Sequence, residues 1–334
     1  MTNNQTVKEI LLEDVQKVTS LYRDPYKRMK AKNRIVGILL ALLRYFILGA
    51  LIFVILFPIF QNLTLALRHP EDLNNPLVIW IPEHWTLFTI KIAYNVLDFS
   101  NTILRSLMVS AIVMVLQVLV TSITGYAFAR LEFPGIKLIF LLVLATIIIP
   151  PQTLELARFF FFRERGLIGS YTSLYLMAAL GMGINSGIFI FIFQQFFRNI
   201  PRELDESAEV DGASVIRTFW SVILPNARSI MITVGLFAFV WQYNDVYYAS
   251  LLQLSSEGRT LLSMRLLNAA ENTYQILVYT GMWGLVGQRI QDNPFFIALV
   301  RNTAAFLMML PILVLFIFLQ RYFVEGIERS GIVG

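Results

Sequence analysis

Residues 198–229 read RNIPRELDESAEVDGASVIRTFWSVILPNARS, a hydrophilic stretch between two long apolar runs. Pro201 suits the first turn of a helix, where its missing N–H costs nothing, and the acidic residues after it lie at the positive end of the helix dipole. Asp211 and Gly212 form a stop signal because glycine readily adopts the left-handed C-terminal conformation. Ser214 can cap the helix that follows. The stretch therefore predicts two short helices joined by a glycine turn.

The second of these helices has one apolar face. Val215, Phe219, Val222 and Ile223 are spaced i, i+4, i+7 and i+8, which places them together on a helix, and Pro225 ends or kinks that helix. An amphipathic segment of this kind can lie on a lipid surface. The first helix is acidic, however, and an anionic inner leaflet repels acidic groups. We therefore interpret the stretch as a rigid docking element for a soluble partner.

The composition of the whole chain is that of a membrane protein. Of its 334 residues, 57% are hydrophobic and 15% are charged, whereas a soluble domain has about 45–50% apolar and about 25% charged residues. The absence of cysteine excludes disulfides, thiolate catalysis and cysteine-based metal sites. The net charge of +5 is not gathered into a basic stripe with interleaved aromatic residues, so we expect no nucleic-acid partner.

Six apolar stretches approach the roughly 20 residues that a helix needs to cross a bilayer. We therefore predict an all-α membrane protein with six transmembrane helices, surrounded by membrane lipid. The first stretch contains Arg44, which we interpret as a side chain that snorkels to the headgroups rather than as a functional intramembrane charge. The six stretches are Ile35–Phe60, Ile103–Phe128, Ile136–Pro150, Tyr171–Phe197, Ile230–Leu252 and Phe295–Phe318.

The distribution of basic residues indicates the orientation, because Lys and Arg gather in cytoplasmic segments. We therefore predict that both termini lie in the cytoplasm. In this orientation, three basic residues fall on the outer side against the rule, namely Arg158, Arg163 and Arg165. The N-terminus lacks the apolar core of a signal peptide, so we expect an uncleaved first span in a multi-pass protein of the inner membrane. The residues that support this orientation are Lys27, Arg28, Lys30, Lys32, Arg34, Arg130, Lys137, Arg198, Arg202, Arg217, Arg228, Arg321 and Arg329.

Two long outer segments, 61–102 and 253–294, are predicted. The first of them contains several prolines, which argue against a long helix there, and both histidines of the chain, His69 and His84. No partner ligands occur at metal-ligand spacing from these histidines. We therefore expect exposed, solvated histidines and no metal site.

The 198–229 stretch resembles the EAA loop of bacterial ABC importer permeases. The pattern of that loop is Glu-Ala-Ala, three residues, Gly, nine residues and then Ile-x-Leu-Pro. Ser207 and Val222 depart from the pattern by small changes of shape. The matching residues are Glu206, Ser207, Ala208, Gly212, Val222, Ile223, Leu224 and Pro225, with Asp211-Gly212-Ala213 as a further likeness.

The resemblance extends over residues 85–334 and is to the maltose-transporter-type permeases for carbohydrate uptake. It implies the type I ABC importer permease architecture with a cytoplasmic coupling helix. Residues 268–294 have no counterpart in the family pattern, so we interpret them as an extracytoplasmic insertion. The further segments that carry the resemblance are Tyr126–Arg130 with Phe133–Gly135, Pro150–Gln152 with Gly166–Leu167, Trp241–Asp245 and Gln320–Gly326.

In that family, the permease pairs with a second, related permease. Two ATPase subunits bind on the cytoplasmic side, and an extracytoplasmic binding protein delivers the substrate. The chain lacks a Gly-x-x-x-x-Gly-Lys-Ser/Thr phosphate loop and any marked catalytic set, so we expect a transport subunit without catalytic residues, metal or cofactor. The residues to which the resemblance assigns ATPase coupling are Glu206, Ser207, Ala208, Asp211, Gly212, Ala213, Phe219, Leu224 and Pro225.

Polar residues within the apolar stretches are candidates for the solute pathway, because polar groups at membrane depth usually face a pathway or a neighbouring helix. For Asn244 and Asp245, helix-packing hydrogen bonds are an equal alternative, and Tyr247 and Tyr248 suit an interfacial aromatic belt. Asn185 is flanked by glycines, which mark a broken or closely packed helix. The pathway candidates are Trp241, Gln242, Tyr243, Asn244, Asp245 and Asn185.

The resemblance favours a sugar or an oligosaccharide as the solute, while a polyamine, a glycerol-phosphate or an amino acid stays open. An ion-coupled secondary transporter is a further alternative, but it would show an inverted repeat and intramembrane acids, and we find no convincing repeat. A membrane-embedded enzyme would need clustered His, Asp or Glu at membrane depth. The predicted organisation is a tail (1–34), a first span (35–60), an outer loop (61–102), an importer domain (103–325) that contains the coupling loop (198–229), and a tail (326–334).

Overall fold

The computed structural model describes residues 25–78, 80–254, 258–286 and 294–331. Within these residues the chain is almost entirely helical, and its β structure is a single bridge between Arg68 and Trp85. The predicted all-α class is therefore confirmed. The chain divides into two compact units, residues 1–61 and 62–334, and each is described by itself.

The helix α2 (Pro25–Ala66) makes up the described part of the first unit and continues into the second. Its segment Lys32–Ala66 includes an 18-residue window with a mean hydropathy of 2.7 and contains the first predicted span. A helix rises about 1.5 Å per residue, so the 42 residues of α2 exceed the length that a hydrocarbon core about 30 Å thick requires. Pro58 lies inside α2 without ending it, and Arg44 is exposed.

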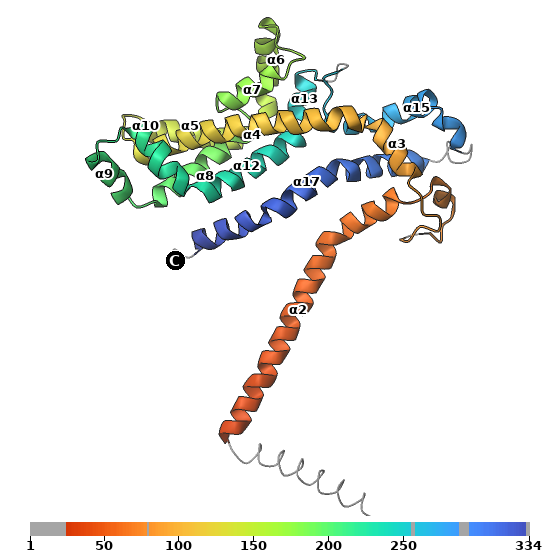
Figure 1. The fold of residues 1–334 in the computed structure, drawn as a ribbon, viewed down its shortest axis with the longest axis horizontal. Helices are drawn as coiled ribbons and strands as arrows, with labels where there is room; N and C mark the ends of the chain where they lie inside the picture. The colour runs from red at the N-terminus through yellow and green to blue at the C-terminus, as the bar shows by residue number, and fades with distance from the viewer. Residues whose placement is uncertain (1–24, 79, 255–257, 287–293, 332–334) are drawn as a thin grey trace, which may run out of the picture. The chain divides into compact units, whose positions relative to one another are not determined.

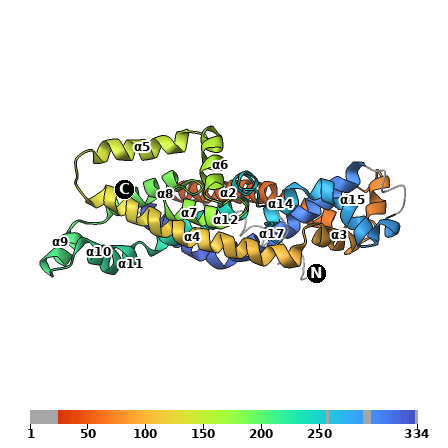
Figure 2. The same ribbon diagram turned by 90° about the horizontal axis from the view of Figure 1, so that it is seen from above.

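The second unit is a bundle of helices and short helical turns (Figures 1 and 2). Its elements are η1 (Pro70–Asn74), α3 (Phe88–Val96), α4 (Phe99–Arg130), α5 (Ile136–Ile148), η2 (Pro151–Leu154), α6 (Glu155–Glu164), α7 (Thr172–Ala179), α8 (Ser186–Asn199), α9 (Glu203–Val210), α10 (Val215–Thr218), η3 (Phe219–Ile223), α11 (Leu224–Asn226), α12 (Arg228–Tyr243), α13 (Tyr247–Leu251), α14 (Leu262–Leu267), α15 (Ala269–Tyr279), η4 (Met282–Leu285) and α17 (Pro294–Gly331).

The long helix α4 is the centre of this bundle. It packs against α8 and α12, and α17 packs against α3 and α12. One buried core joins α4, α8 and α12 through Val118, Phe193 and Val234, and another joins α12 to α17 through Phe239 and Met308. Figures 1 and 2 show α9 and α10 at one end of the bundle and α3 and α15 at the opposite end.

The predicted spans differ from the observed helices in one main respect, which is that several of them are broken. The predicted fourth span, 171–197, is divided into α7 and α8, because Gly181 and Asn185 have φ values of +71° and +57° and a continuous right-handed helix does not accommodate that backbone. The pair α5 and η2–α6 bends by 102°. By length and composition, the described residues contain three spans, or up to five if each bent pair is one span. The count of six stays a prediction.

The segment predicted as an outer insertion, 268–294, is partly integrated into the bundle. Its helix α15 packs against α3 and α17, where Leu277 shares a buried core with Ile92 and Val300. Residues 287–293 lie outside the described part of the chain. The described part of the insertion thus contributes to the core at this end of the bundle.

The loop between η1 and α3 is closed by one buried carboxylate. Asp72 Oδ2 accepts the Glu83 and His84 backbone N–H groups at 3.0 and 3.1 Å, and Asp72 Oδ1 lies 2.7 Å from His84 Nδ1. These three residues bring ligand atoms within 4.8 Å of one another, so the expectation that His84 has no partner was wrong, whereas its side chain is exposed as expected. Since both Asp72 oxygens already hold the loop together, hydrogen bonding accounts for the cluster.

Candidate coupling site and solute cavity

The 198–229 loop forms two short helices at one end of the bundle (Figure 1). Gly212 follows α9 with a φ of +77°. Its N–H donates to the Glu209 carbonyl, and the Ala213 N–H donates to the Ala208 carbonyl, both at 2.9 Å, which closes the end of α9. No atom lies within 4 Å of the place that a Cβ on Gly212 would take. The backbone conformation, and not lack of space, therefore selects glycine at the predicted turn.

Beyond this turn, the chain forms α10, a π-helical turn (η3) and α11, where the sequence predicted one helix. Ser214 caps α10, since its Oγ accepts the Arg217 N–H at 3.4 Å. In η3, the Leu224 N–H donates to the Phe219 carbonyl, five residues back, and Pro225 has no N–H with which to close the next turn. The chain then bends by 83° into α12.

The predicted apolar face of this segment is buried only in part. Phe219 and Ile223 are 4% and 0% exposed and belong to the core between α4, α8 and α12. Val222 is half-buried, and Val215 is exposed. A π-helical turn takes up more residues than an α-helical turn, so the i, i+4, i+7, i+8 stripe does not continue straight through η3. Val215 therefore does not share the buried face of Phe219 and Ile223.

The tip of the loop exposes apolar side chains instead. Val210, Ile216 and Trp220, which we call the tip residues, are 87%, 72% and 45% exposed. By contrast, Ala208 and Phe219 are 7% and 4% exposed, so in this chain they support the fold of the loop. The EAA-loop pattern does not include the tip residues. Apolar residues within a hydrophilic loop were nevertheless a signal in the sequence that could have identified them. Of the other motif positions, Glu206, Ser207, Asp211, Gly212 and Pro225 are exposed, and Ala213 and Leu224 are half-buried.

Aromatic rings fasten the loop to α4 and α8. The Tyr126 ring centroid lies 5.1 Å from that of Phe219 and 5.9 Å from that of Phe197, which it meets edge to face. Such pairs contribute about 0.5–1.5 kcal/mol each beyond their area burial. The loop is therefore held by contacts to two helices of the bundle in addition to its chain connections.

An ion pair lies beside these rings. Arg130 Nε lies 3.2 Å from Asp205 Oδ2, and the Tyr126 hydroxyl donates to Asp205 Oδ1 at 3.2 Å. Arg130 Nη2 also donates to the Ile200 carbonyl. The side chains of Arg130 and Asp205 are 6% and 23% exposed, and removing one partner of such a pair leaves a largely buried charge uncompensated.

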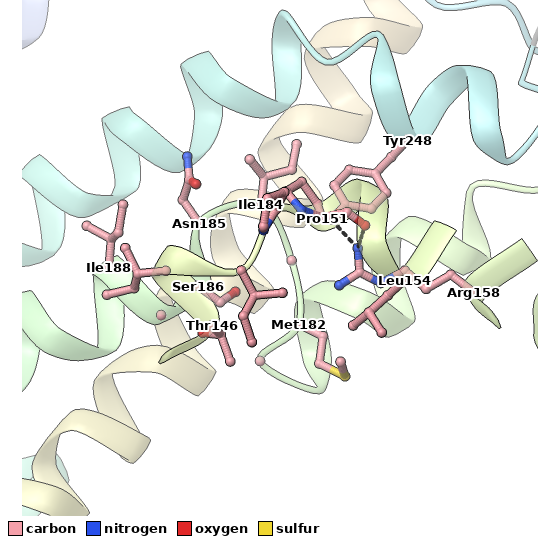
Figure 3. A pocket seen from close by; sticks show the side chains of 16 residues that line it. Thr146, Pro151, Leu154, Arg158, Met182, Ile184, Asn185, Ser186, Ile188 and Tyr248 are labelled. Atoms are coloured by element: carbon pink, nitrogen blue, oxygen red, sulfur yellow. Dashed lines mark hydrogen bonds between the residues drawn. The ribbon is translucent and has the colours of Figure 1, made fainter. Parts of the chain in front are cut away.

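A cavity of about 220 Å³ lies where the broken helices meet (Figure 3). Arg158 Nη1 donates to the Tyr248 hydroxyl at 2.7 Å, and Figure 3 shows the two side chains pointing toward each other while Asn185 lies apart from them. The cavity thus offers a guanidinium, a phenol and amide groups for hydrogen bonding. Its lining residues are Thr146, Ile147, Ile149, Pro150, Pro151, Leu154, Arg158, Gly181, Met182, Gly183, Ile184, Asn185, Ser186, Gly187, Ile188 and Tyr248.

The predicted pathway stretch 241–245 lies outside the lining of this cavity. Trp241 stacks on Phe189 with ring centroids 5.3 Å apart, and the Tyr243 hydroxyl donates to the Met308 carbonyl at 3.0 Å. These contacts join α12 to α8 and α17. Gln242 is buried, and its side chain is not among the cavity-lining groups.

At the end of the stretch, the carboxylate of Asp245 and the side-chain amide of Asn244 both form hydrogen bonds to nearby backbone groups. Asp245 is buried, and its two carboxylate oxygens accept the Tyr248 and Ala249 N–H groups at 3.1 and 3.0 Å, which caps α13. The Asn244 side chain donates to the Val240 carbonyl at 2.8 Å. Of the pathway candidates, Asn185 lines the cavity. Tyr248 also lines it, although the sequence analysis interpreted this residue as part of an interfacial aromatic belt.

Residues 91–329 match the family described as binding-protein-dependent transport system inner membrane component. The chain belongs to this family. The permease is therefore a membrane component of a transport system and not an enzyme, and the predicted membership of the ABC importer permeases is confirmed.

Relatives of the permease cover most of its length. It is 30% identical to the maltodextrin transport system permease protein MdxG of Bacillus subtilis (strain 168), over 75% of the permease and 81% of MdxG. It is 24% identical to the melibiose/raffinose/stachyose import permease protein MelC of the same strain, over 83% and 91% of the two chains. A chain in the crystal structure of a bacterial ABC transporter involved in the import of the acidic polysaccharide alginate shares the fold, with a TM-score of 0.65, 17% identity and coverage of 87% and 98%.

Proposed function

We propose that this permease forms half of the transmembrane pathway of an ATP-driven importer for a sugar or an oligosaccharide. The family supports the role in a binding-protein-dependent system, and relatives named for maltodextrin and for melibiose, raffinose and stachyose support the solute class. The pathway is completed by a second, related permease. An extracytoplasmic binding protein delivers the solute on one side, and two ATPase subunits act on the other.

The observation that carries the coupling role is the exposed apolar tip of a loop that is itself firmly held. Apolar side chains exposed together on a protein surface mark interaction sites, and Ile216 at 72% exposure and Val210 at 87% are suited to a groove of a soluble subunit. The motif residues Glu206, Ser207 and Asp211 are also exposed, on α9 or directly after it. The loop thus docks on an ATPase subunit in the cytoplasm, and with six spans both termini of the permease lie in the cytoplasm as well.

The cavity at the broken helices is the proposed contribution to solute contact. Arg158, Tyr248 and Asn185 supply groups that hydrogen-bond to sugar hydroxyls, and the apolar lining of Ile184 and Leu154 suits the C–H faces of a sugar ring. Pathways of this kind have apolar walls and a few placed polar groups.

Uptake by the reconstituted importer tests the function. Proteoliposomes that contain the permease, its partner permease and the ATPase subunits should accumulate labelled maltodextrin or melibiose when the binding protein and internal ATP are present. An ion gradient without ATP should not drive uptake. Uptake that follows an ion gradient and ignores ATP would contradict the importer role, and uptake of amino acids in place of sugars would contradict the solute class.

Docking by the tip is tested separately with Ile216→Glu, which places a charge where an apolar contact is proposed. Co-purification of the ATPase subunits with the permease should fall by about tenfold, in line with the loss of one central interface anchor, while the amount of permease in the membrane is unchanged. The control is Arg217→Gln, which alters the neighbouring exposed residue without adding an acid. Equal ATPase recovery from the Ile216→Glu variant and the wild type would remove the docking assignment.

A further inference from the structure

We propose that Arg130 ties α4 to the 198–229 loop, so that α4 follows a movement of the loop together with α8 and α12. Arg130 acts as a positioning residue, because it acts through Asp205. This inference rests on the proposed coupling function of the loop and adds the route by which a movement reaches the central helix of the bundle.

The chain itself connects the loop to only two helices. α8 ends at Asn199, just before α9, and α11 leads through Ala227 into α12. The end of α4 is distant in sequence, since Asp205 follows Tyr126 by 79 positions. A link between α4 and the loop must therefore be made by side chains, and Arg130 is the last residue of α4.

The Arg130 guanidinium holds two parts of the loop at once. Nε lies 3.2 Å from Asp205 Oδ2 on α9, and Nη2 donates to the Ile200 carbonyl in the connection from α8 to α9. The planar fork of arginine makes this double attachment possible, whereas the single ammonium of lysine is a point donor. The second Asp205 oxygen accepts the Tyr126 hydroxyl at 3.2 Å, so α4 holds that carboxylate from two of its turns.

The surroundings of the pair indicate a firm link rather than an incidental surface contact. The Arg130 side chain is 6% exposed, and a pair removed from solvent is screened by salt far less than an exposed pair. Arg130 also lies at the C-terminus of α4, where the helix dipole favours a cation. The other charged residues near the pair, Arg202, Glu206 and Glu209, are exposed, and they line a cavity of about 250 Å³ together with the pair.

The test compares uptake with ATP hydrolysis in the complete reconstituted importer. The variants are Arg130→Met and Asp205→Asn, which keep much of the side-chain size and remove the ion pair. The control is Glu209→Gln, which removes a charge one turn further along α9. We expect both variants to hydrolyse ATP within about twofold of the wild-type rate and to transport about fivefold less solute per ATP, a size typical of altered coupling. The Glu209→Gln variant should keep the wild-type ratio.

A covalent link provides the second measurement. The chain contains no cysteine, so Arg130→Cys combined with Asp205→Cys gives one defined pair of thiols for a short bismaleimide. Before the reaction, this double variant should have a low transport ratio, which is the amount of solute transported per ATP hydrolysed. Cross-linking should raise that ratio at least threefold, because the tether replaces the ion pair. Arg130→Lys should lie between Arg130→Met and the wild type, because it keeps the charge without the fork.

The outcomes separate the inference from the function on which it rests. If the wild-type complex shows no ATP-driven uptake, the proposed function fails. If the wild type transports and the assembled Arg130→Met and Asp205→Asn variants keep its ratio, the link from Arg130 to α4 is overturned and the coupling function stands. Should Arg130→Met fail to assemble, the double cysteine variant decides, because cross-linking that restores assembly without raising the transport ratio also overturns the inference.

Discussion

Gly125 of α4 and Phe193 of α8 are so close that a Cβ on Gly125 would lie 2.6 Å from the Phe193 Cβ. The Gln194 backbone nitrogen would lie 3.0 Å from the same point, so the contact cannot be relieved by rotating a side chain. Small residues at membrane helix interfaces allow this kind of close approach between backbones. α4 and α8 are thus packed at a distance that only glycine permits at this position.

The first prediction follows from this contact. Gly125→Ala should lower the thermal stability of the purified permease, because α4 and α8 must separate, at a cost of about 1–3 kcal/mol for overpacking. The matched control is Gly235→Ala in α12, where the nearest atoms would be 3.7 Å from the added Cβ. That change should be neutral or stabilising, since alanine is the better helix former. A Gly125→Ala variant as stable as Gly235→Ala would show that the helices are not packed this closely.

The second prediction concerns the turn at Gly212. Gly212→Val should weaken recovery of the ATPase subunits by about tenfold and leave membrane insertion intact, because a β-branched residue is strained at a φ of +77°. Gly212→Asn is the control, as asparagine tolerates the left-handed region. Co-purification of the ATPase with each variant provides the measurement, and normal ATPase recovery with Gly212→Val would contradict the docking role of this turn.

The third prediction separates the two roles of Asn185, which has a φ of +57° and lines the cavity. Asn185→Gly keeps the left-handed backbone and removes the amide, so the protein should fold normally and take up solute several-fold more slowly. Asn185→Val should also lower thermal stability, because a β-branched residue is an outlier in this region. Wild-type uptake by Asn185→Gly would mean that the residue serves the backbone alone.

The fourth prediction is a pH dependence of the loop between η1 and α3. The hydrogen bond to Asp72 raises the pKa of His84 above its usual 6.5. Burial alone would raise the pKa of Asp72, but the hydrogen bonds from the His84 side chain and from the His84 and Glu83 backbone outweigh it and lower that pKa below 3.8. The pair thus stabilises the loop fully between pH 3.8 and pH 6.5, and its contribution is lost as pH rises through the elevated pKa of His84. The Asp72 contribution is lost only at pH values below 3.8.

Limited proteolysis across this pH range measures the effect. Cleavage within residues 70–86 should become faster as pH rises above 6.5. The Asp72→Asn variant should be cleaved rapidly at every pH, because its side chain holds the backbone N–H groups less strongly. The His84→Gln variant should lose the pH dependence and should be cleaved more slowly than the Asp72→Asn variant. A pH dependence that persists in His84→Gln would assign it to another group.

The sequence predicts the long helices well and the breaks poorly. In α2, α4 and α17, the mean hydropathy over about 20 residues is high enough to predict a membrane-spanning helix. The same average hides the division of 171–197 into α7 and α8, because two residues with left-handed backbone, Gly181 and Asn185, hardly change the mean hydropathy. The glycines around Asn185 did indicate a broken or closely packed helix, and both descriptions hold, since a Cβ on Gly187 would lie 2.6 Å from Thr146 Oγ1.

The coupling loop shows a similar limit at the level of side chains. Motif spacing located the glycine turn, but it did not distinguish residues that face the bundle from residues that face outward. Phe219 is buried and Ile216 is exposed because of the π-helical turn and the bend that follows, and neither is encoded by a simple period. Pairs distant in sequence, such as Arg130 with Asp205, depend on tertiary packing and have no local signal at all.

The breaks at Pro150–Pro151 and at Gly181–Asn185 have a consequence for hydration. Each one leaves peptide N–H and C=O groups without helical partners in a stretch that is otherwise apolar, and hydrocarbon offers nothing to which they can bond. Irregular backbone at that depth is stable only against protein or in contact with water. At both breaks the chain supplies such partners itself, since Gln117 Nε2 donates to the Ile184 carbonyl and the Tyr247 hydroxyl donates to the Pro151 carbonyl. In this way the protein itself solvates backbone groups that the interrupted helices leave open.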